Sequence, residues 1–182
     1  MHVTKRHLPH IYEVGCPLFV TFRLYGSLPK GRYFDRNSVT SGQAFDCLDR
    51  LLDRETCGPL HLKMPGIAQL VSQAIQQGEP EDYCLHAWVV MPNHVHLLIT
   101  PRRDVSQLLQ RLKGATARQA NQQLHREGDP FWQRESYDRM VRDAEEFRRI
   151  ENYIVRNPVR AGLAASTECY QWSNAWNPAA VR

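Results

Sequence analysis

The stretch Val89-Val90-Met91-Pro92-Asn93-His94-Val95-His96-Leu97-Leu98-Ile99 joins two apolar runs through a short Met-Pro-Asn turn. Side chains alternate between the two faces of a strand, so His94 and His96 share one face while Val95 takes the other. Two imidazoles spaced by about 7 Å along one face can hold a single metal ion from the same side. Two polar rings in a run of valine and leucine therefore indicate a metal site inside a sheet.

Hydrophobic periodicity divides the rest of the chain into strands and helices. Strands are predicted over residues 18–25, 83–90, 94–100 and 136–142. Helices are predicted over residues 37–53, 65–77, 106–124 and from 143 to about 156. The last helix begins at a sequence close to a capping box and is expected to end at Pro158.

The order of these elements predicts an α+β fold. It fits a ferredoxin-like or RRM-like βαββαβ core, with one central antiparallel sheet and helices mainly on one face. Extra helices and irregular N- and C-terminal extensions complete the chain. The histidine strand should then lie near the middle of the sheet.

Length and composition indicate one folded domain. With 182 residues, 42% of them apolar and 23% charged, the chain is long enough to bury a core and lacks the composition of a disordered protein. We expect residues 1–182 to form a single domain, with a basic N-terminal arm over residues 1–17 and a tail over residues 163–182.

Targeting signals and cysteine usage suggest the compartment. No apolar run approaches the roughly 20 residues that cross a bilayer, and no secretion signal follows the basic N-terminus. Five cysteines without a C-x-x-C pair argue against a disulfide framework or a cysteine zinc site. We therefore expect a cytoplasmic protein with no membrane partner.

Positive charge gathers on one segment. The net charge is only +4, yet residues 102–118 contain a single acid, Asp104, among five basic residues. These basic residues are Arg102, Arg103, Arg111, Lys113 and Arg118. Next to a metal site this excess indicates an anionic partner, whereas without one a solvated helix face would explain it.

The last predicted helix carries a second polar pair. Phe147, Ile150 and Ile154 form its apolar stripe, and Tyr153 and Asn157 lie one above the other at the edge of that stripe. Both polar side chains can therefore reach toward the sheet. Taken alone the pair is weak evidence of function, because a tyrosine at a stripe edge usually packs in the core.

The combination with the histidine pair is more specific. His-x-His on a strand, followed by a helical tyrosine with a polar residue four positions later, resembles the single-tyrosine branch of the HUH endonuclease superfamily. The closer resemblance is to the REP-associated tyrosine transposases (RAYTs), and it extends over nearly the whole chain in the expected order. The similar stretches are residues 18–29, 91–96, 131–134, 153–163 and 170–173.

This resemblance implies a metal-dependent single-stranded DNA endonuclease or strand transferase that cuts at or near REP-type DNA hairpins. Carried over residue by residue, His94, His96 and Asn157 would be metal ligands for Mg²⁺ or Mn²⁺, and Tyr153 would be the catalytic nucleophile. Attack by tyrosine would leave a 5′-phosphotyrosine link and a free 3′-hydroxyl, so the strand could be rejoined. The relatives favour a monomer over a dimer.

Basic side chains are the candidates for contacts with DNA phosphates. They are Lys5, Arg6, Arg23, Arg102, Arg103, Arg111, Lys113 and Arg118. Trp132 could stack on a base, although core packing is the more common role of such a residue. A protein of this kind would associate with the nucleoid when bound to DNA.

Three alternatives stay open. Tyr137, on the predicted strand 136–142, is a rival nucleophile. A metal hydrolase that uses water would need a carboxylate near the histidines, and residues 88–100 contain none. A nucleic-acid-binding module on the same frame, without catalysis, would display aromatic residues where this chain has histidines.

Overall fold

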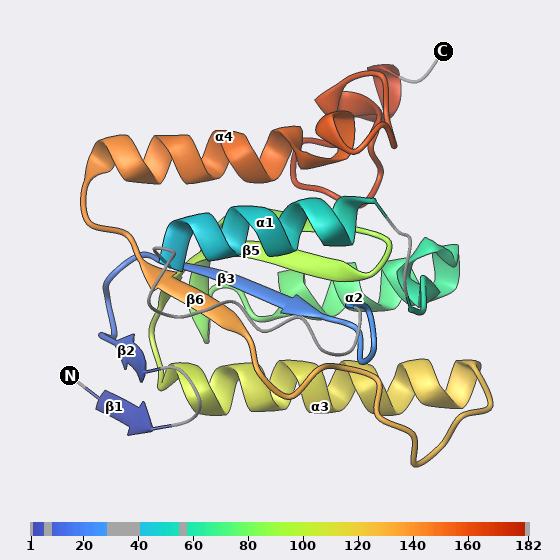
Figure 1. The fold of residues 1–182 in the computed structure, drawn as a ribbon, viewed down its shortest axis with the longest axis horizontal. Helices are drawn as coiled ribbons and strands as arrows, with labels where there is room; N and C mark the ends of the chain where they lie inside the picture. The colour runs from blue at the N-terminus through green and yellow to red at the C-terminus, as the bar shows by residue number, and fades with distance from the viewer. Residues whose placement is uncertain (1, 6–8, 29–40, 55–57, 181–182) are drawn as a thin grey trace.

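A four-stranded antiparallel sheet forms the centre of the molecule (Figure 1). The computed structural model describes residues 2–5, 9–28, 41–54 and 58–180. The strands lie in the order β4-β5-β3-β6, with bounds Tyr83–Val90, His94–Pro101, Leu18–Arg23 and Tyr137–Met140. The prediction that the histidine strand lies inside the sheet is confirmed, because β5 pairs with β4 on one side and β3 on the other.

Four α-helices cover the sheet. They are α1 (Ser41–Asp53), α2 (Pro65–Gln77), α3 (Val105–Gln123) and α4 (Ala144–Arg160). Short 3₁₀ helices occur at His61–Lys63, Thr167–Cys169 and Pro178–Ala180. The predicted α+β class is confirmed, and the predicted helices agree with these bounds to within a few residues, apart from residues 37–40, which lie outside the described part.

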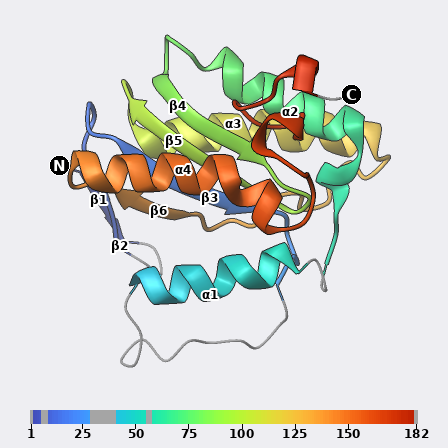
Figure 2. The same cartoon turned by 90° about the horizontal axis from the view of Figure 1, so that it is seen from above.

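The helices cover both faces of the sheet, whereas the sequence pattern predicted them mainly on one (Figure 2). Alternation along the strands explains this. One face, with Val20, Val95 and Leu97, packs against α2 and α3, and the other, with Phe19 and Leu98, packs against α1 and α4. Central strands that are apolar on both faces need cover on both.

The N-terminal arm is more regular than predicted. Within residues 1–17, β1 (His2–Lys5) and β2 (Pro9–Tyr12) form a two-stranded antiparallel sheet. The N-terminal extension was expected to be irregular, but Pro9 occupies the first position of β2, where a strand tolerates proline.

The prediction that α4 ends at Pro158 is wrong, because the helix continues to Arg160. The carbonyl groups around the proline find partners in the next turn, since Ala161 N donates to Asn157 O (2.9 Å) and Leu163 N donates to Pro158 O (2.8 Å). The terminus therefore comes one turn later, where Gly162 adopts a positive φ.

The C-terminal tail packs along the edge of β4. Val90 N donates to Trp172 O (2.8 Å), and Trp88 N donates to Asn174 Oδ1 (2.9 Å). The Tyr170 hydroxyl donates to Val90 O (2.9 Å). This segment thus supplies partners for an edge strand whose polar groups would otherwise face solvent.

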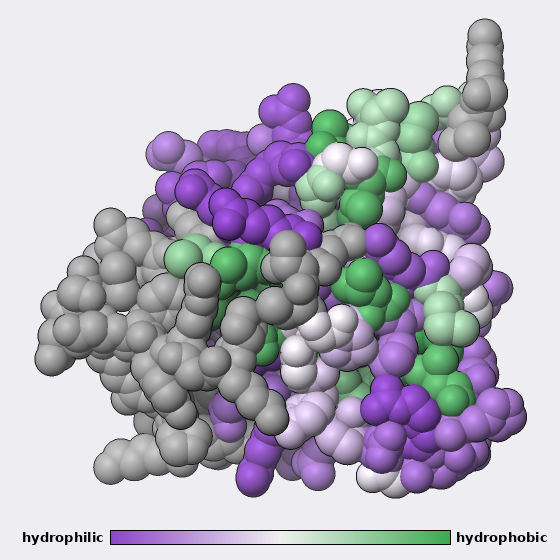
Figure 3. Space-filling view, turned by 45° about the vertical axis from the view of Figure 1, so that its right-hand side comes forward, coloured by the Kyte–Doolittle hydropathy of each residue, from purple (hydrophilic) through white to green (hydrophobic). Residues whose placement is uncertain are grey.

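The surface agrees with this layering. Hydrophilic side chains gather over α4, at the upper left of Figure 3, while the apolar stripe of that helix faces the sheet. Among the described residues, no helix combines the length and hydropathy needed to span a bilayer. The described cysteines, Cys16, Cys47, Cys84 and Cys169, are free thiols.

We expect Leu97→Ala to lower the free energy of unfolding by about 2–5 kcal/mol, because Leu97 is fully buried in the middle of β5 and its removal leaves a cavity. Urea denaturation followed by circular dichroism measures the change. The control Val159→Ala, at a residue that is 36% exposed, should change the same quantity by no more than about 0.5 kcal/mol. Equal losses in the two variants would contradict the placement of the core.

Candidate metal and nucleophile site

His94 and His96 point from β5 toward the layer formed by α1 and α4, and both are fully buried. Their Nε2 atoms lie 3.0 Å apart. On the far side of each ring, His94 Nδ1 lies 2.6 Å from Asn93 Oδ1 and His96 Nδ1 lies 2.7 Å from Thr21 Oγ1. The two rings are therefore held from behind, with the opposite nitrogens converging on one point, as in metal sites whose outer partners orient the ligands.

The tautomer of His94 follows from its neighbour. Asn93 Nδ2 donates to Leu52 O (3.0 Å), which leaves Asn93 Oδ1 as the acceptor that faces His94. His94 Nδ1 must then carry the proton, and Nε2 keeps a free lone pair. Burial lowers the pKa of His94 to about 3. The charge of His96 also lowers this pKa, whereas the charge of Asp49 raises it, and the ring is neutral at pH 7.

The helix α4 brings the predicted tyrosine and asparagine to the same point. Asn157 is fully buried, and its Nδ2 lies 3.4 Å from His96 Nε2. The Tyr153 ring lies edge-on to the His96 ring, with centroids 5.6 Å apart. The side chains of His94, His96, Tyr153 and Asn157 thus meet within one chain.

A carboxylate that the sequence analysis missed completes the site. Asp49 on α1 is buried, and its Oδ1 lies 3.1 Å from His96 Nε2 and 3.7 Å from His94 Nε2. Its other oxygen, Oδ2, accepts a hydrogen bond from the Tyr153 hydroxyl. One carboxylate therefore contacts both imidazoles and the phenol.

A signal for Asp49 was present in the sequence. It falls four residues after Phe45 and three before Leu52, on the stripe that the helix turns toward the core. A charged residue in such a position is seldom buried without a partner or a metal. Residues 88–100 contain no acid, as the sequence shows, but α1 brings this carboxylate to the histidines from elsewhere in the chain.

The donor set fits a divalent cation. Among the described residues, Asp49, His94 and His96 offer ligand atoms that all lie within 4.8 Å of one another. Within this part of the chain, Asp49 Oδ1 and Asn157 Oδ1 are buried without hydrogen-bond partners. Turning the Asn157 amide over would bring Oδ1 to the position beside His96. Imidazole nitrogen with carboxylate and amide oxygen is a common ligand set for divalent metals.

The electrostatics around Tyr153 keep its phenol protonated. Burial, then the charge and hydrogen bond of Asp49, raise the pKa of the Tyr153 hydroxyl far above its ordinary value. Arg160 acts in the opposite direction, with its guanidinium carbon 4.9 Å from the centre of the Tyr153 ring. For Asp49, burial alone would raise the carboxyl pKa, but His96 and His94 outweigh it and hold the pKa well below its usual range.

The comparison with known families adds to this geometry. The family model described as "Transposase IS200 like" matches residues 67–157, which run from α2 to Asn157 and include the histidine pair and Tyr153. The chain belongs to this family. A search of curated proteins finds no match.

A solved structure supports the fold of this IS200-like transposase family member. The structure is that of a REP-associated tyrosine transposase bound to a REP hairpin, with a TM-score of 0.60 and 20% sequence identity. The match covers 95% of this chain and 82% of the other. The two chains thus share one fold over most of their length, which confirms the predicted fold.

The predicted DNA-contact residues fall into separate regions. Arg23 lies opposite His94 in the β3–β5 pairing, on the histidine face, and its guanidinium is hydrogen-bonded to Ser27 (3.2 Å). Arg6 lies outside the described residues, and Lys5 belongs to β1. The remaining five, Arg102, Arg103, Arg111, Lys113 and Arg118, lie on or just before α3, which covers the opposite face of the sheet.

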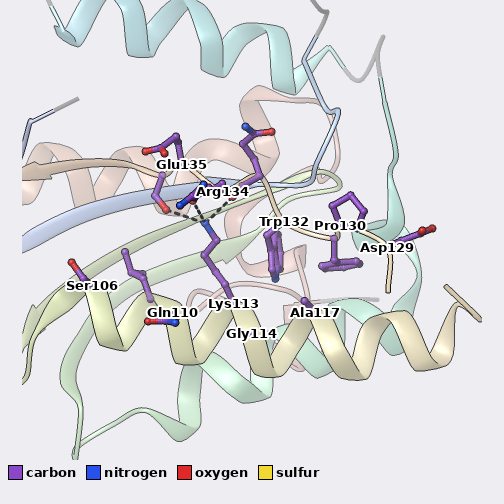
Figure 4. Close-up of a pocket in the computed structure, with 14 residues that line it drawn as sticks. Ser106, Gln110, Lys113, Gly114, Ala117, Asp129, Pro130, Trp132, Arg134 and Glu135 are labelled. Atoms are coloured by element: carbon purple, nitrogen blue, oxygen red, sulfur yellow. Dashed lines mark hydrogen bonds between the residues drawn. The ribbon is translucent and has the colours of Figure 1, made fainter. Parts of the chain in front are cut away.

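Lys113 closes one side of a cavity of about 480 Å³ between α3 and residues 129–136 (Figure 4). Its ammonium group donates to the carbonyls of Gln133 (2.8 Å) and Arg134 (3.0 Å). Trp132 is buried beside it, with Nε1 donating to Thr116 Oγ1 (2.9 Å). Trp132 therefore packs in the core, the more common of the two roles considered.

We expect Mn²⁺ to raise the melting temperature of the protein, because a ligand that binds only the folded state stabilises it. At a Mn²⁺ concentration 100 times its dissociation constant, the gain is about 2.7 kcal/mol, or roughly 5–10 °C for a chain of this size. Differential scanning fluorimetry with and without EDTA measures this shift.

His96→Ala should abolish the shift, and Asp49→Asn should reduce it. His86→Ala is the matched control, because His86 lies on the neighbouring strand and is hydrogen-bonded to Thr100 (2.8 Å), away from the site. An undiminished shift in His96→Ala, or an equal loss in His86→Ala, would rule out the assigned metal site.

Proposed function

We propose that this protein is a metal-dependent single-stranded DNA endonuclease and strand transferase that forms a covalent 5′-phosphotyrosine intermediate. The observation that carries the proposal is the convergence on Asp49, where a phenol from α4 and two imidazoles from β5 contact one buried carboxylate. A tyrosine placed beside a candidate metal site is an arrangement suited to phosphodiester transfer, because it holds a nucleophile next to the group that can polarise the phosphate.

His94, His96 and Asn157 are the proposed metal ligands, with Asp49 as an additional one, and Mg²⁺ or Mn²⁺ as the ion. When bound there, a divalent ion would supply positive charge that polarises the scissile phosphate and favours a phenolate. Nitrogen ligands favour Mn²⁺, whereas Mg²⁺ usually retains more water.

The protein supplies both the group that attacks phosphorus, Tyr153, and the group that accepts its proton, Asp49. In the proposed reaction Tyr153 Oη forms a bond to phosphorus, the P–O3′ bond breaks, and the Tyr153 proton passes to Asp49 Oδ2, its hydrogen-bond acceptor. The departing O3′ takes up one proton from solvent and becomes a 3′-hydroxyl, and Asp49, whose pKa is low, returns the Tyr153 proton to solvent. Rejoining is the reverse attack by a 3′-hydroxyl, for which no additional energy source is needed.

Single-stranded DNA next to a hairpin is the proposed substrate. The solved relative is described as bound to a REP hairpin, and this chain shares its fold. Arg23 is the predicted basic residue on the histidine face, so we assign it to DNA near the reacting phosphate. The five basic residues on the α3 side would contact backbone farther along the DNA, where they add salt-dependent affinity.

One chain holds a complete set of the proposed catalytic groups. Tyr153 contacts Asp49 and His96 of its own chain, so a second copy is not needed to supply the nucleophile. We therefore propose a monomer that acts in the cytoplasm on nucleoid DNA.

A water-using metal hydrolase is the second candidate, and Asp49 is the observation in its favour, since a carboxylate beside a metal site can serve as a base for water. The same carboxylate, however, accepts a hydrogen bond from the Tyr153 hydroxyl, which favours the tyrosine as nucleophile. Tyr137 is less suited as a nucleophile, because its ring stacks on Phe45 with centroids 4.4 Å apart.

We expect wild-type protein, incubated with Mn²⁺ and a labelled DNA hairpin carrying single-stranded flanks, to form a protein–DNA adduct that survives denaturation. Because Tyr153 is the proposed nucleophile, Tyr153→Phe should form no adduct, whereas Tyr137→Phe should still form it. Denaturing gel electrophoresis detects the shifted band.

Hairpins from a pool with randomised flanks serve as the probe. Cleaved DNA without an adduct would favour the hydrolase, and binding without cleavage would favour the non-catalytic module. Adduct formation by Tyr153→Phe would overturn the assignment of the nucleophile.

A further inference from the structure

A second cavity opens beside Tyr153. It has a volume of about 320 Å³ and lies between β6, α4 and α1. Its apolar wall consists of Phe19, Phe45 and Tyr137, and Tyr153, whose ring centroid is 5.6 Å from that of His96, also lines it. The volume is at the lower end of the range for small-molecule sites, roughly 300–1,000 Å³. An occupant of this cavity would therefore touch the proposed nucleophile.

The aromatic wall is a connected set of rings. Tyr137 stacks on Phe45 with centroids 4.4 Å apart and an interplanar angle of 28°, and Phe19 meets Tyr137 edge-on at 6.2 Å. Phe19 and Phe45 each lie 6.1 Å from Tyr153. Phe45 is buried, whereas Tyr137 remains partly exposed. The wall thus offers a ring surface to a planar ligand.

The opposite rim is a cluster of arginines around one carboxylate. Glu146 is only 3% exposed, and its Oε1 pairs with Arg139 (2.5 Å) and Arg149 (3.4 Å), while Oε2 pairs with Arg142 (3.0 Å). Burial alone would raise the Glu146 pKa, but the hydrogen bonds from Arg142 and the charge of Arg139 lower it, so the carboxylate stays ionised. Of these arginines, Arg139 and Arg149 line the cavity, and their two guanidinium groups outnumber the one Glu146 carboxylate in its lining.

The position of Glu146, which also lines the cavity, explains why its partners Arg139 and Arg149 face the cavity. Glu146 N donates to the capping residue Asp143 (2.7 Å), and Glu146 Oε2 accepts from Arg142 N (2.9 Å), which fixes the carboxylate at the start of α4. Arg139 approaches from β6 and Arg149 from the next turn of α4; both line the cavity, and their side chains are 30% and 69% exposed. Exposed guanidinium groups held in place in this way suit a phosphate.

From this geometry we propose that the cavity binds one unstacked nucleotide of the DNA strand, directly adjacent to the phosphate that Tyr153 attacks. The base lies against Tyr137 and Phe45, and the phosphate on its other side contacts Arg139 and Arg149. The proposal rests on the proposed function and extends it to a subsite. A nucleotide unites both features of the cavity, because it has a planar base and an anion on one small unit.

The subsite also accounts for a single-stranded substrate. A base inside a duplex is stacked and paired, so it cannot enter a cavity of this size without leaving the helix. A nucleotide of a flexible strand carries a much smaller cost, and contact with an aromatic ring compensates for it. The cavity would thereby hold the reacting phosphate in position over Tyr153.

An abasic scan tests the proposal. The probe is a labelled hairpin oligonucleotide that wild-type protein cleaves, prepared as a series in which each nucleotide near the mapped cut is replaced by an abasic site. Fluorescence anisotropy in the Tyr153→Phe background measures the dissociation constant. One abasic position next to the cut should weaken binding by roughly 5- to 100-fold, the range for loss of one stacked base.

Protein variants locate that effect in the cavity. In Tyr137→Leu the same abasic position should no longer weaken binding, since the stacking surface is already lost. Arg149→Gln should weaken binding of the intact oligonucleotide several-fold. Arg148→Gln is the matched control, because Arg148 is exposed on the same turn of α4 but does not line the cavity. The dissociation constant of this variant for the intact oligonucleotide should stay within twofold of that of the parent protein.

The outcomes separate this subsite from the proposed function. If the wild type forms the adduct but no abasic position next to the cut matters, or Arg148→Gln and Arg149→Gln weaken binding equally, the subsite is wrong and the function stands. If no hairpin in the pool yields an adduct, the proposed function fails and the subsite fails with it. Melting curves confirm that each variant folds, and the scan with the Tyr153→Phe protein does not depend on the folding of Tyr137→Leu.

Discussion

Two imidazole nitrogens 3.0 Å apart in a fully buried strand set the central constraint of this structure. Both rings aim Nε2 at the same point, and two lone pairs that face each other in a poorly solvated interior repel strongly. A shared proton or a cation between them removes it. The surroundings favour a cation, because Asp49 and Asn157 add oxygens that have no hydrogen-bond partner in the described part of the chain. The apolar packing of α1 and α4 over this face brings these oxygens to the histidines, since the two helices carry them.

Local pattern in the sequence predicted much of the fold and singled out four of the five side chains that meet at the site. The bounds of α2 and β4 were predicted correctly because their periodicity is regular and their ends carry proline, glycine or turn residues. His94 and His96 could be paired because a strand fixes which side chains share a face. Tyr153 and Asn157 could be paired because a helix does the same at a spacing of four residues.

What sequence reasoning missed depends on contacts between distant segments. Asp49 reaches the histidines only because α1 crosses the same sheet face, a placement that no local period specifies. The helices on both faces, and the continuation of α4 through Pro158, likewise depend on tertiary packing and on carbonyls that find partners further along the chain. The basic residues of α3 were predicted to be near the site from their place in the sequence, but α3 packs on the other face.

The C-terminal segment that lies along β4 bears on how copies of this molecule can meet. Trp172 and Asn174 occupy backbone groups of Val90 and Trp88, so a strand from another chain finds those groups already taken. The opposite border of the sheet is β6, which is only four residues long. Pairing of sheet edges between chains, a common route to aggregation, is therefore opposed at this end of β4 by the chain's own C-terminal segment.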